Sequence, residues 1–152
     1  MEDFFKVITP ICIGFVSAFF GSRLALIKFK KEKDWERKEK AYSEIIDSLY
    51  DLLQHCEIHK ENYGQGTGYS ELKENSFREK YDKAFWQIKK VTDIGAFVIS
   101  ESTNQVLVSL RNREKWDWNS NPSFEIYESD YKYYKSALKE IVAIAKDELQ
   151  SK

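Results

Sequence analysis

The chain has 152 residues, a formal net charge of -1, 32% charged residues and 15% aromatic residues. This length suits one compact domain together with a membrane segment, and a second globular domain is not expected. The mixture of charged and aromatic residues favours a folded domain over disorder, and the near-neutral charge argues against direct, sequence-specific nucleic-acid binding, which needs a strongly basic face.

The N-terminal segment is the most apolar part of the sequence. No residue from Val7 to Ser22 is charged, and apolar residues resume after Arg23. As a helix, residues 4–27 would reach roughly 36 Å, compared with about 30 Å of hydrocarbon in a bilayer. The sequence therefore predicts a transmembrane anchor over residues 1–29 and a domain over 30–152. A cleaved signal peptide and a buried core helix are the alternatives, and the acidic start argues against the signal peptide.

A cluster of lysines follows the apolar segment directly: Lys28, Lys30, Lys31 and Lys33. Because acidic residues precede the segment, the positive-inside rule predicts a single-pass protein of the cell inner membrane, with its N-terminus outside and its C-terminal domain in the cytoplasm. The lysines would lie against the anionic headgroups of the bilayer. The alternative is that they only determine the topology.

Small residues recur four apart along the predicted anchor, at Gly14, Ala18 and Ser22. Small residues at this spacing let two transmembrane helices approach closely, so they predict a homo-oligomer that associates within the membrane. The alternative is that such residues are simply common in transmembrane helices.

Beyond the anchor, apolar residues recur at three-four spacing, which predicts amphipathic helices. The first helix ends near residue 62 and is either continuous with the anchor or joined to it near Lys30, and further helices are expected over 71–99, 100–113 and 124–149. Ser100 or Ser102 is the expected cap of the short third helix. No strand pattern competes, so the predicted fold is all-α, an N-terminal transmembrane helix followed by an antiparallel helical bundle.

The side chains expected to face the core follow the same spacing. They are Trp35, Tyr42, Ile45, Ile46, Leu49, Leu52, Leu53 and Cys56 in the first helix, Leu72, Phe77, Tyr81, Phe85, Ile88, Thr92 and Ala96 in the second, Val106, Leu107 and Leu110 in the third, and Tyr127, Tyr131, Tyr134, Leu138, Ile141, Ala145 and Leu149 in the fourth.

The sequence offers little for catalysis. His55 and His59 lie four apart on one helix, but the glutamate near them, Glu57, is not adjacent to His55 as in zinc proteases, and no third ligand is suggested. The acidic residues are scattered, and no Ser or Cys nucleophile has an obvious histidine partner. We therefore expect no metal, no cofactor and no enzymatic activity.

Aromatic residues are more frequent near the C-terminal helix than a bundle core requires. Trp116, Trp118 and Tyr133 are the candidates for an exposed patch that binds a partner.

The order of these parts resembles a known group of proteins. Trp35-Glu36-Arg37-Lys38 and Ala41-Tyr42 open a long amphipathic helix behind the anchor, and Asp93-Ile94-Gly95-Ala96-Phe97 follows later. The chain is similar to the small transmembrane effectors encoded beside reverse transcriptases in retron-type antiphage systems. The resemblance implies an effector that a reverse transcriptase and its RNA-linked DNA hold inactive, and that disturbs the inner membrane on infection.

The leading functional hypothesis is a membrane-perturbing effector of antiviral defence that acts through self-association of its anchor. The alternative is a membrane-anchored scaffold or adaptor that binds a cytoplasmic partner.

Overall fold

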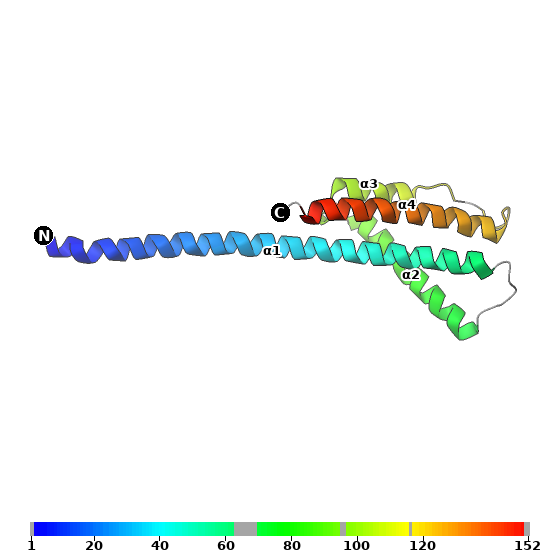
Figure 1. The fold of residues 1–152 in the computed structure, drawn as a ribbon, viewed down its shortest axis with the longest axis horizontal. Coiled ribbons are helices and arrows are strands. Elements are labelled where there is room, and N and C mark those ends of the chain that lie inside the picture. The colour runs from blue at the N-terminus through cyan, green and yellow to red at the C-terminus, as the bar shows by residue number, and fades with distance from the viewer. Residues whose placement is uncertain (1, 63–69, 95–96, 116, 151–152) are drawn as a thin grey trace. The chain divides into compact units, whose positions relative to one another are not determined.

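In the computed structural model, which describes residues 2–62, 70–94, 97–115 and 117–150, the chain folds into four helices (Figure 1). They are α1 (Glu2–Asn62), α2 (Glu71–Ile94), α3 (Glu101–Arg111) and α4 (Ser123–Gln150). In α1 the side chains are described from residue 18 to residue 61. No strand occurs in these ranges, so the predicted all-helical class is confirmed.

The chain divides into two compact units, Met1–Arg37 and Lys38–Lys152. α1 passes through the division without interruption, so the residues predicted as an anchor and the first helix of the bundle belong to one helix. The sequence had suggested a domain boundary near residue 30, on the N-terminal side of this division.

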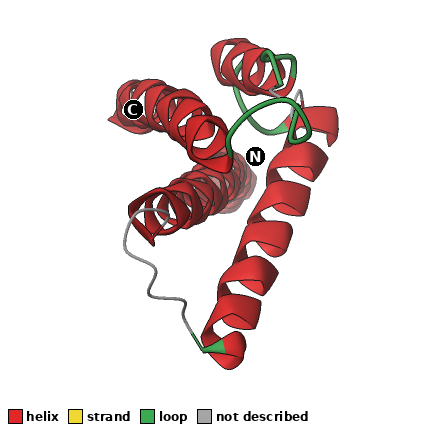
Figure 2. Cartoon of the chain, turned by 90° about the vertical axis from the view of Figure 1, so that its right-hand side faces the viewer, coloured by secondary structure: helices red, strands yellow, loops and turns green. Residues whose placement is uncertain are grey.

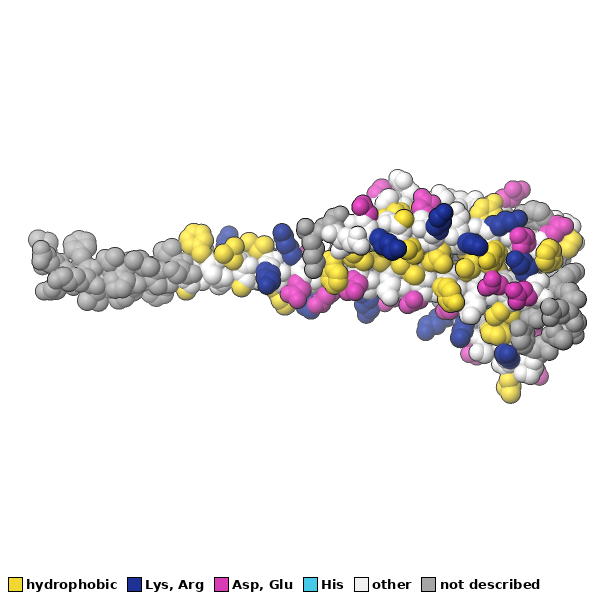
Figure 3. All heavy atoms as spheres, in the orientation of Figure 1, with side chains coloured by type: hydrophobic (Ala, Val, Ile, Leu, Met, Phe, Trp, Pro, Cys, Tyr) yellow, Lys and Arg dark blue, Asp and Glu magenta, His cyan; other side chains and the backbone are white. Residues whose placement is uncertain are grey.

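The described side chains of α1 begin at Ala18, so most of the predicted anchor lies outside them. No helix of the described residues has both the length and the apolar character needed to cross a membrane. Between residues 18 and 29 the large apolar side chains each expose more than half of their surface: Phe19, Phe20, Leu24, Leu26, Ile27 and Phe29. Figure 3 shows apolar side chains beside the grey segment, with basic and then acidic side chains further along α1.

The second unit is a helical bundle around one core, as predicted. α1 contributes Tyr42, Ile45, Leu49, Leu52 and Cys56, at the three-four spacing of a helix face. The other helices contribute Ala84, Ile88 and Thr92 from α2, Thr103, Leu107 and Leu110 from α3, and Ile126, Tyr134, Ala137, Ile141 and Ala145 from α4. Each helix therefore buries one stripe of its surface, which is the main source of stability in such a fold.

The inward face of α2 differs from the prediction at Leu72 and Phe85. Leu72 is 85% exposed and Phe85 is 39% exposed, although both were expected in the core. α2 is inclined to α1 and α4 (Figures 1 and 2), its buried residues Ala84, Ile88 and Thr92 all lie in its C-terminal half, and Tyr81 packs partly buried against the core.

The inward face of α4 matches the predicted seam at Tyr134, Ile141 and Ala145 and differs from it at two positions. Ile126 and Ala137 are buried, whereas their neighbours Tyr127 and Leu138 are only partly buried. An alanine at the contact lets a helix approach its neighbours closely, which the larger leucine would prevent.

α2 ends earlier than predicted, at Ile94 instead of Ile99. Ile99 is buried in the turn before α3. Ser100 caps α3, because its hydroxyl oxygen accepts a hydrogen bond from the backbone N–H of Thr103 at 3.3 Å, which confirms one of the two predicted caps.

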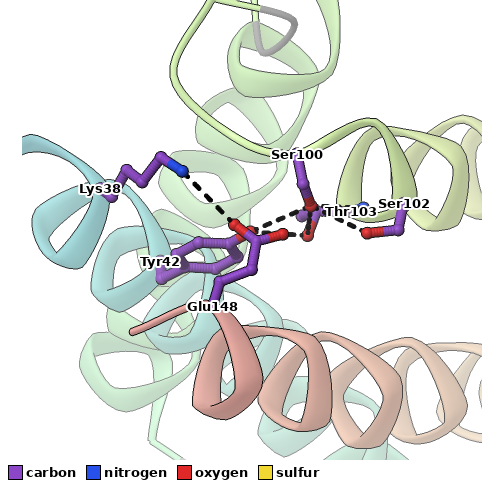
Figure 4. Close-up of polar contacts among 6 residues, drawn as sticks. All are labelled: Lys38, Tyr42, Ser100, Ser102, Thr103 and Glu148. Atoms are coloured by element: carbon purple, nitrogen blue, oxygen red, sulfur yellow. Dashed lines mark hydrogen bonds and ion pairs between the residues drawn. The ribbon is translucent and has the colours of Figure 1, made fainter. Parts of the chain in front are cut away.

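A buried polar network joins α1 to the start of α3 (Figure 4). The Tyr42 hydroxyl lies 3.0 Å from Thr103 Oγ1 and 3.2 Å from Ser100 Oγ. Tyr42 and Thr103 are almost completely buried, so these hydroxyls have to satisfy one another. Beside them, Lys38 Nζ lies 3.8 Å from Glu148 Oε2 and pairs α1 with the end of α4.

Candidate functional site

The predicted small-residue face lies on the first unit. Ala18 and Ser22 are exposed, and a Cβ added to the neighbouring Gly21 would meet no atom within 4 Å. Ser22 Oγ donates a hydrogen bond to the carbonyl oxygen of Phe19 at 2.9 Å, so its hydroxyl is satisfied within the helix. Gly14 belongs to the part of α1 whose surroundings are outside the described residues.

The predicted membrane-surface lysines are all exposed on α1: Lys28, Lys30, Lys31 and Lys33. At about 100° of rotation per residue, their side chains leave the helix on several sides. Lys33 forms an ion pair with Glu36 one turn later, and its ammonium group lies 5.8 Å from the centre of the Phe29 ring. The lysines therefore follow the exposed apolar residues as a belt around the helix.

The predicted aromatic patch is only partly described. Trp116 lies outside the described residues. Trp118 is 56% exposed, in a turn that Asp117 organises by accepting hydrogen bonds from Asn119 N–H at 3.1 Å and Ser120 Oγ at 2.7 Å. These hydrogen bonds lower the pKa of the Asp117 carboxyl. Tyr133 is exposed on α4 and is not among the described residues that line a cavity with Trp118.

Trp118 instead borders a cleft that the sequence did not predict, beside the inclined helix α2. The cleft consists of two adjoining cavities, of about 460 Å³ and about 380 Å³, which share Tyr81, Trp118 and Asp130. We call them the basic cavity and the histidine cavity, after the side chains that distinguish them.

The histidine cavity contains a row of five rings from α2, α1, α4 and the loop before α4. In order they are Tyr81, His55, His59, Tyr127 and Trp118, with successive ring centres 4.3 to 5.4 Å apart. Acidic side chains line this cavity at Glu74, Asp82 and Asp130, together with the cationic Arg78. Burial lowers the pKa of His55 to about 4, and the neighbouring His59 adds to this shift. Burial also lowers the pKa of His59, so both rings are neutral near pH 7.

The basic cavity has an apolar floor and a cationic rim. Its floor includes Leu52, Ile88, Leu110 and Ile126, one residue from each helix. Its rim carries Lys89, Arg111, Arg113 and Lys115. Aromatic side chains of Tyr81, Phe85, Trp118 and Tyr134 form its walls.

Arg113 fixes Asp130, which lines both cavities. Its Nε and Nη2 atoms donate to Asp130 Oδ1 at 3.0 and 2.8 Å, Nη2 also donates to the Tyr134 hydroxyl at 3.0 Å, and Nη1 donates to the Leu110 carbonyl oxygen at 3.1 Å. A guanidinium carries five N–H donors, so the protein itself uses most of this group. Arg113 therefore holds α4 against the end of α3.

The described side chains offer little for metal binding or nucleophilic chemistry. No three His, Cys, Asp or Glu side chains within the described residues are placed to hold a metal ion. Burial raises the pKa of the Cys56 thiol to about 12, so this sulfur stays protonated and is a poor nucleophile.

Sequence patterns alone assigned the cleft residues to other places. Tyr81 and Phe85 were expected in the core, and Arg113 was only the end of the third helix. The concentration of cations from Lys89 to Lys115 near helix ends, beside the tryptophan of the following loop, is the signal that points to this site. In comparisons with known proteins, the chain matches no family model, no curated protein and no solved structure.

Proposed function

We propose that the chain is a membrane-anchored effector whose helical bundle lies in the cytoplasm. The observation that carries this proposal is the exposed apolar surface of α1 between Phe19 and Phe29, where large side chains have no protein cover among the described residues. Fully burying one such side chain contributes about 1.5–3 kcal/mol. Lipid that surrounds both this segment and the uncharged residues before it would supply that burial.

The lysine belt supports the same orientation. Lys28 and Lys31 follow the apolar residues at once, and each lysine near an anionic surface contributes about 1 kcal/mol. Long lysine side chains can extend toward the headgroups while their stems remain against apolar surface. The segment from Lys28 to Lys33 would thus mark the cytoplasmic surface of the membrane.

The effector activity in this proposal comes from self-association of the anchor. Ala18 and Ser22 are small and exposed, and together with Gly14 they would form the contact between copies in the bilayer. Association would open or weaken the membrane when the bundle changes state. The resemblance to retron-type effectors adds a defence role and a reverse transcriptase with its RNA-linked DNA as the controlling partner.

The test is to enlarge the proposed contact. The double variant Gly14→Ile/Ala18→Ile should abolish both growth arrest and membrane depolarisation on induction, while the protein stays in the carbonate-resistant membrane fraction. Val16→Leu/Phe20→Leu changes the other side of the same helix and should leave toxicity unchanged. Full toxicity of the first variant would remove the self-association mechanism.

An adaptor function is the second candidate, supported by the outer face of α2. Leu72, Trp86 and Ile94 are all more than half exposed. They are separated by about four and two helical turns, so they lie on one side of α2. Exposed apolar side chains aligned in this way are typical of a protein-binding surface.

The two candidates make opposite predictions for Trp86→Glu/Ile94→Glu. An adaptor would lose its cytoplasmic partner in co-purification and lose its cellular effect. A membrane-perturbing effector would keep its toxicity when expressed alone.

A further inference from the structure

The basic cavity has the size of a small-molecule site and lies within the second unit. Its volume of about 460 Å³ falls in the range of roughly 300–1,000 Å³ that is typical of ligand pockets. The core residues Leu52, Leu110 and Ile126 form its floor, so their positions are fixed by packing in the bundle. A ligand there would meet a preformed surface.

The charges around the basic cavity are strongly unequal. Four of its lining residues are cationic and only Asp130 is acidic. Asp130 is already paired with Arg113, and Arg111 pairs with Asp93 at 2.7 Å. Lys89 lies 4.6 Å from the centre of the Trp86 ring, and no carboxylate of the described residues forms an ion pair with Lys89 or Lys115. Two cations at the rim are therefore left without an acidic partner.

The walls of the basic cavity favour a flat ligand. Tyr81 and Phe85 are stacked, with ring centres 6.2 Å apart and an angle of 16° between the planes, on the α2 side. Trp118 stands at the boundary with the histidine cavity and exposes 56% of its surface. Aromatic side chains bind flat rings by stacking, and indole is the largest such surface.

The adjoining histidine cavity has the opposite balance of charge. Glu74 and Asp82 line it in addition to the shared Asp130, Arg78 is its one cationic lining residue among those described, and its histidines are neutral near pH 7. An anion would therefore bind less favourably there than beside Lys89 and Lys115. The two halves of the cleft thus differ in the charge that they select.

We propose that the basic cavity binds a small aromatic anion, with its ring beside Trp118 and its charge between Lys89 and Lys115. This chemistry is shared by aromatic carboxylates and by nucleoside monophosphates. The site goes beyond the proposed membrane function and does not depend on it.

The binding test uses the full chain in nanodiscs of uncharged lipid, so that the lipid itself does not attract or repel the probe. Naphthalene-1-sulfonate is titrated by calorimetry, with 1-naphthalenemethanol as its uncharged analogue. We expect a Kd between about 1 µM and 1 mM for the anion and weaker binding of the alcohol by about tenfold. Adenosine monophosphate and indole-3-acetate are then titrated in the same way. The one that binds with the lower Kd shows whether the ligand is a nucleoside monophosphate or an aromatic carboxylate.

Two pairs of variants assign the binding to this cavity. Lys89→Glu/Lys115→Glu should weaken binding of the sulfonate by about tenfold or more. Lys139→Glu/Lys146→Glu makes the same charge change at exposed positions of α4 outside the cavity and should leave it unchanged. Trp118→Ala should weaken the binding of both the sulfonate and the alcohol, because the ring of each is proposed to stack on Trp118.

Three results would overturn the proposal. They are no binding of any aromatic anion in this concentration range, equal binding of the sulfonate and the alcohol, or an equal loss in the two charge-reversal pairs. All exchanged lysines are exposed, so circular dichroism is expected to show the same folded bundle in each variant. Loss of the fold in the Lys89/Lys115 pair would move the test to Lys89→Gln/Lys115→Gln, which should weaken binding to a smaller degree.

Discussion

The Tyr42 hydroxyl is the polar atom that fixes the start of α3 to α1. It lies within hydrogen-bond distance of both Ser100 and Thr103, and Thr103 has no exposed surface. Tyr42→Phe keeps the ring and removes only this oxygen, so a buried threonine hydroxyl loses a partner. We expect the free energy of unfolding to fall by about 1–2 kcal/mol, measured by urea unfolding of the full chain in a mild non-ionic detergent.

The matched control for this change is Tyr133→Phe, because Tyr133 is exposed on α4. The free energy of unfolding of that variant should lie within about 0.5 kcal/mol of the wild-type value. Equal stabilities of Tyr42→Phe and the wild type would show that water replaces the lost hydroxyl.

His55 makes the stability of the bundle depend on pH. Burial lowers its pKa in the folded chain from 6.5 to about 4. As the pH falls through 6.5, the unfolded chain binds a proton at His55 and the folded chain does not, so stability is fully present above pH 6.5 and is lost toward pH 4. One pKa unit corresponds to about 1.4 kcal/mol, and we expect a loss of about 1 kcal/mol between pH 7.5 and 5.5.

The variant His55→Phe separates this effect from other titrating groups, since it keeps a ring in the same row. Unfolding at pH 7.5 and 5.5 should differ less in this variant than in the wild type, with His59 providing the remaining difference because its pKa is also lowered. An unchanged pH dependence would assign the effect to carboxylates instead.

At the scale of elements, the inclination of α2 creates the cleft, and Ala84 is where this helix enters the core. Ala84 is buried, and its Cβ faces the other helices at the contact. Ala84→Leu adds three carbon atoms at a packed position and should destabilise the bundle by about 1–3 kcal/mol. The measurement is the same unfolding experiment.

Ala143→Leu is the control for this substitution, because Ala143 is exposed on α4. It should leave stability nearly unchanged. If Ala84→Leu has as little effect, the contact between α2 and the core is looser than its burial indicates.

Local signals in the sequence predicted much of the element structure. Three-four spacing identified the buried stripe of α1 from Tyr42 to Cys56, and the cap at Ser100 identified the start of α3. Both depend on residues close together in the chain. The angle of α2 depends instead on which helix it meets, and a stripe such as Leu72 to Phe85 looks the same whether or not a neighbour covers it. The cleft follows from that angle, which is why Trp118 alone among its lining residues was predicted to bind a partner.

At the scale of the whole molecule, the chain contains two surfaces of different kinds. The second unit buries its apolar stripes within a core, whereas α1 from Phe19 to Phe29 leaves them exposed in the first unit. Exposed apolar residues of this size need a cover, because large apolar patches in water are unfavourable. Lipid and a second copy of the chain are the two covers that the proposed function combines.

The lysine belt allows the proposed orientation to be tested directly. Lys28, Lys30, Lys31 and Lys33 are exposed, so their replacement by glutamate leaves the helix intact and reverses the charge that determines topology. A C-terminal alkaline phosphatase fusion, active only outside the cytoplasm, should be inactive on the wild-type chain and gain activity on the fourfold variant. The same four substitutions at Lys80, Lys83, Lys139 and Lys146 change the net charge equally, far from the segment, and should leave the fusion inactive. Phosphatase activity on the wild-type chain, or recovery of that chain without detergent, would contradict the orientation, because a belt of cations next to an apolar segment orients a protein only if the segment is inserted.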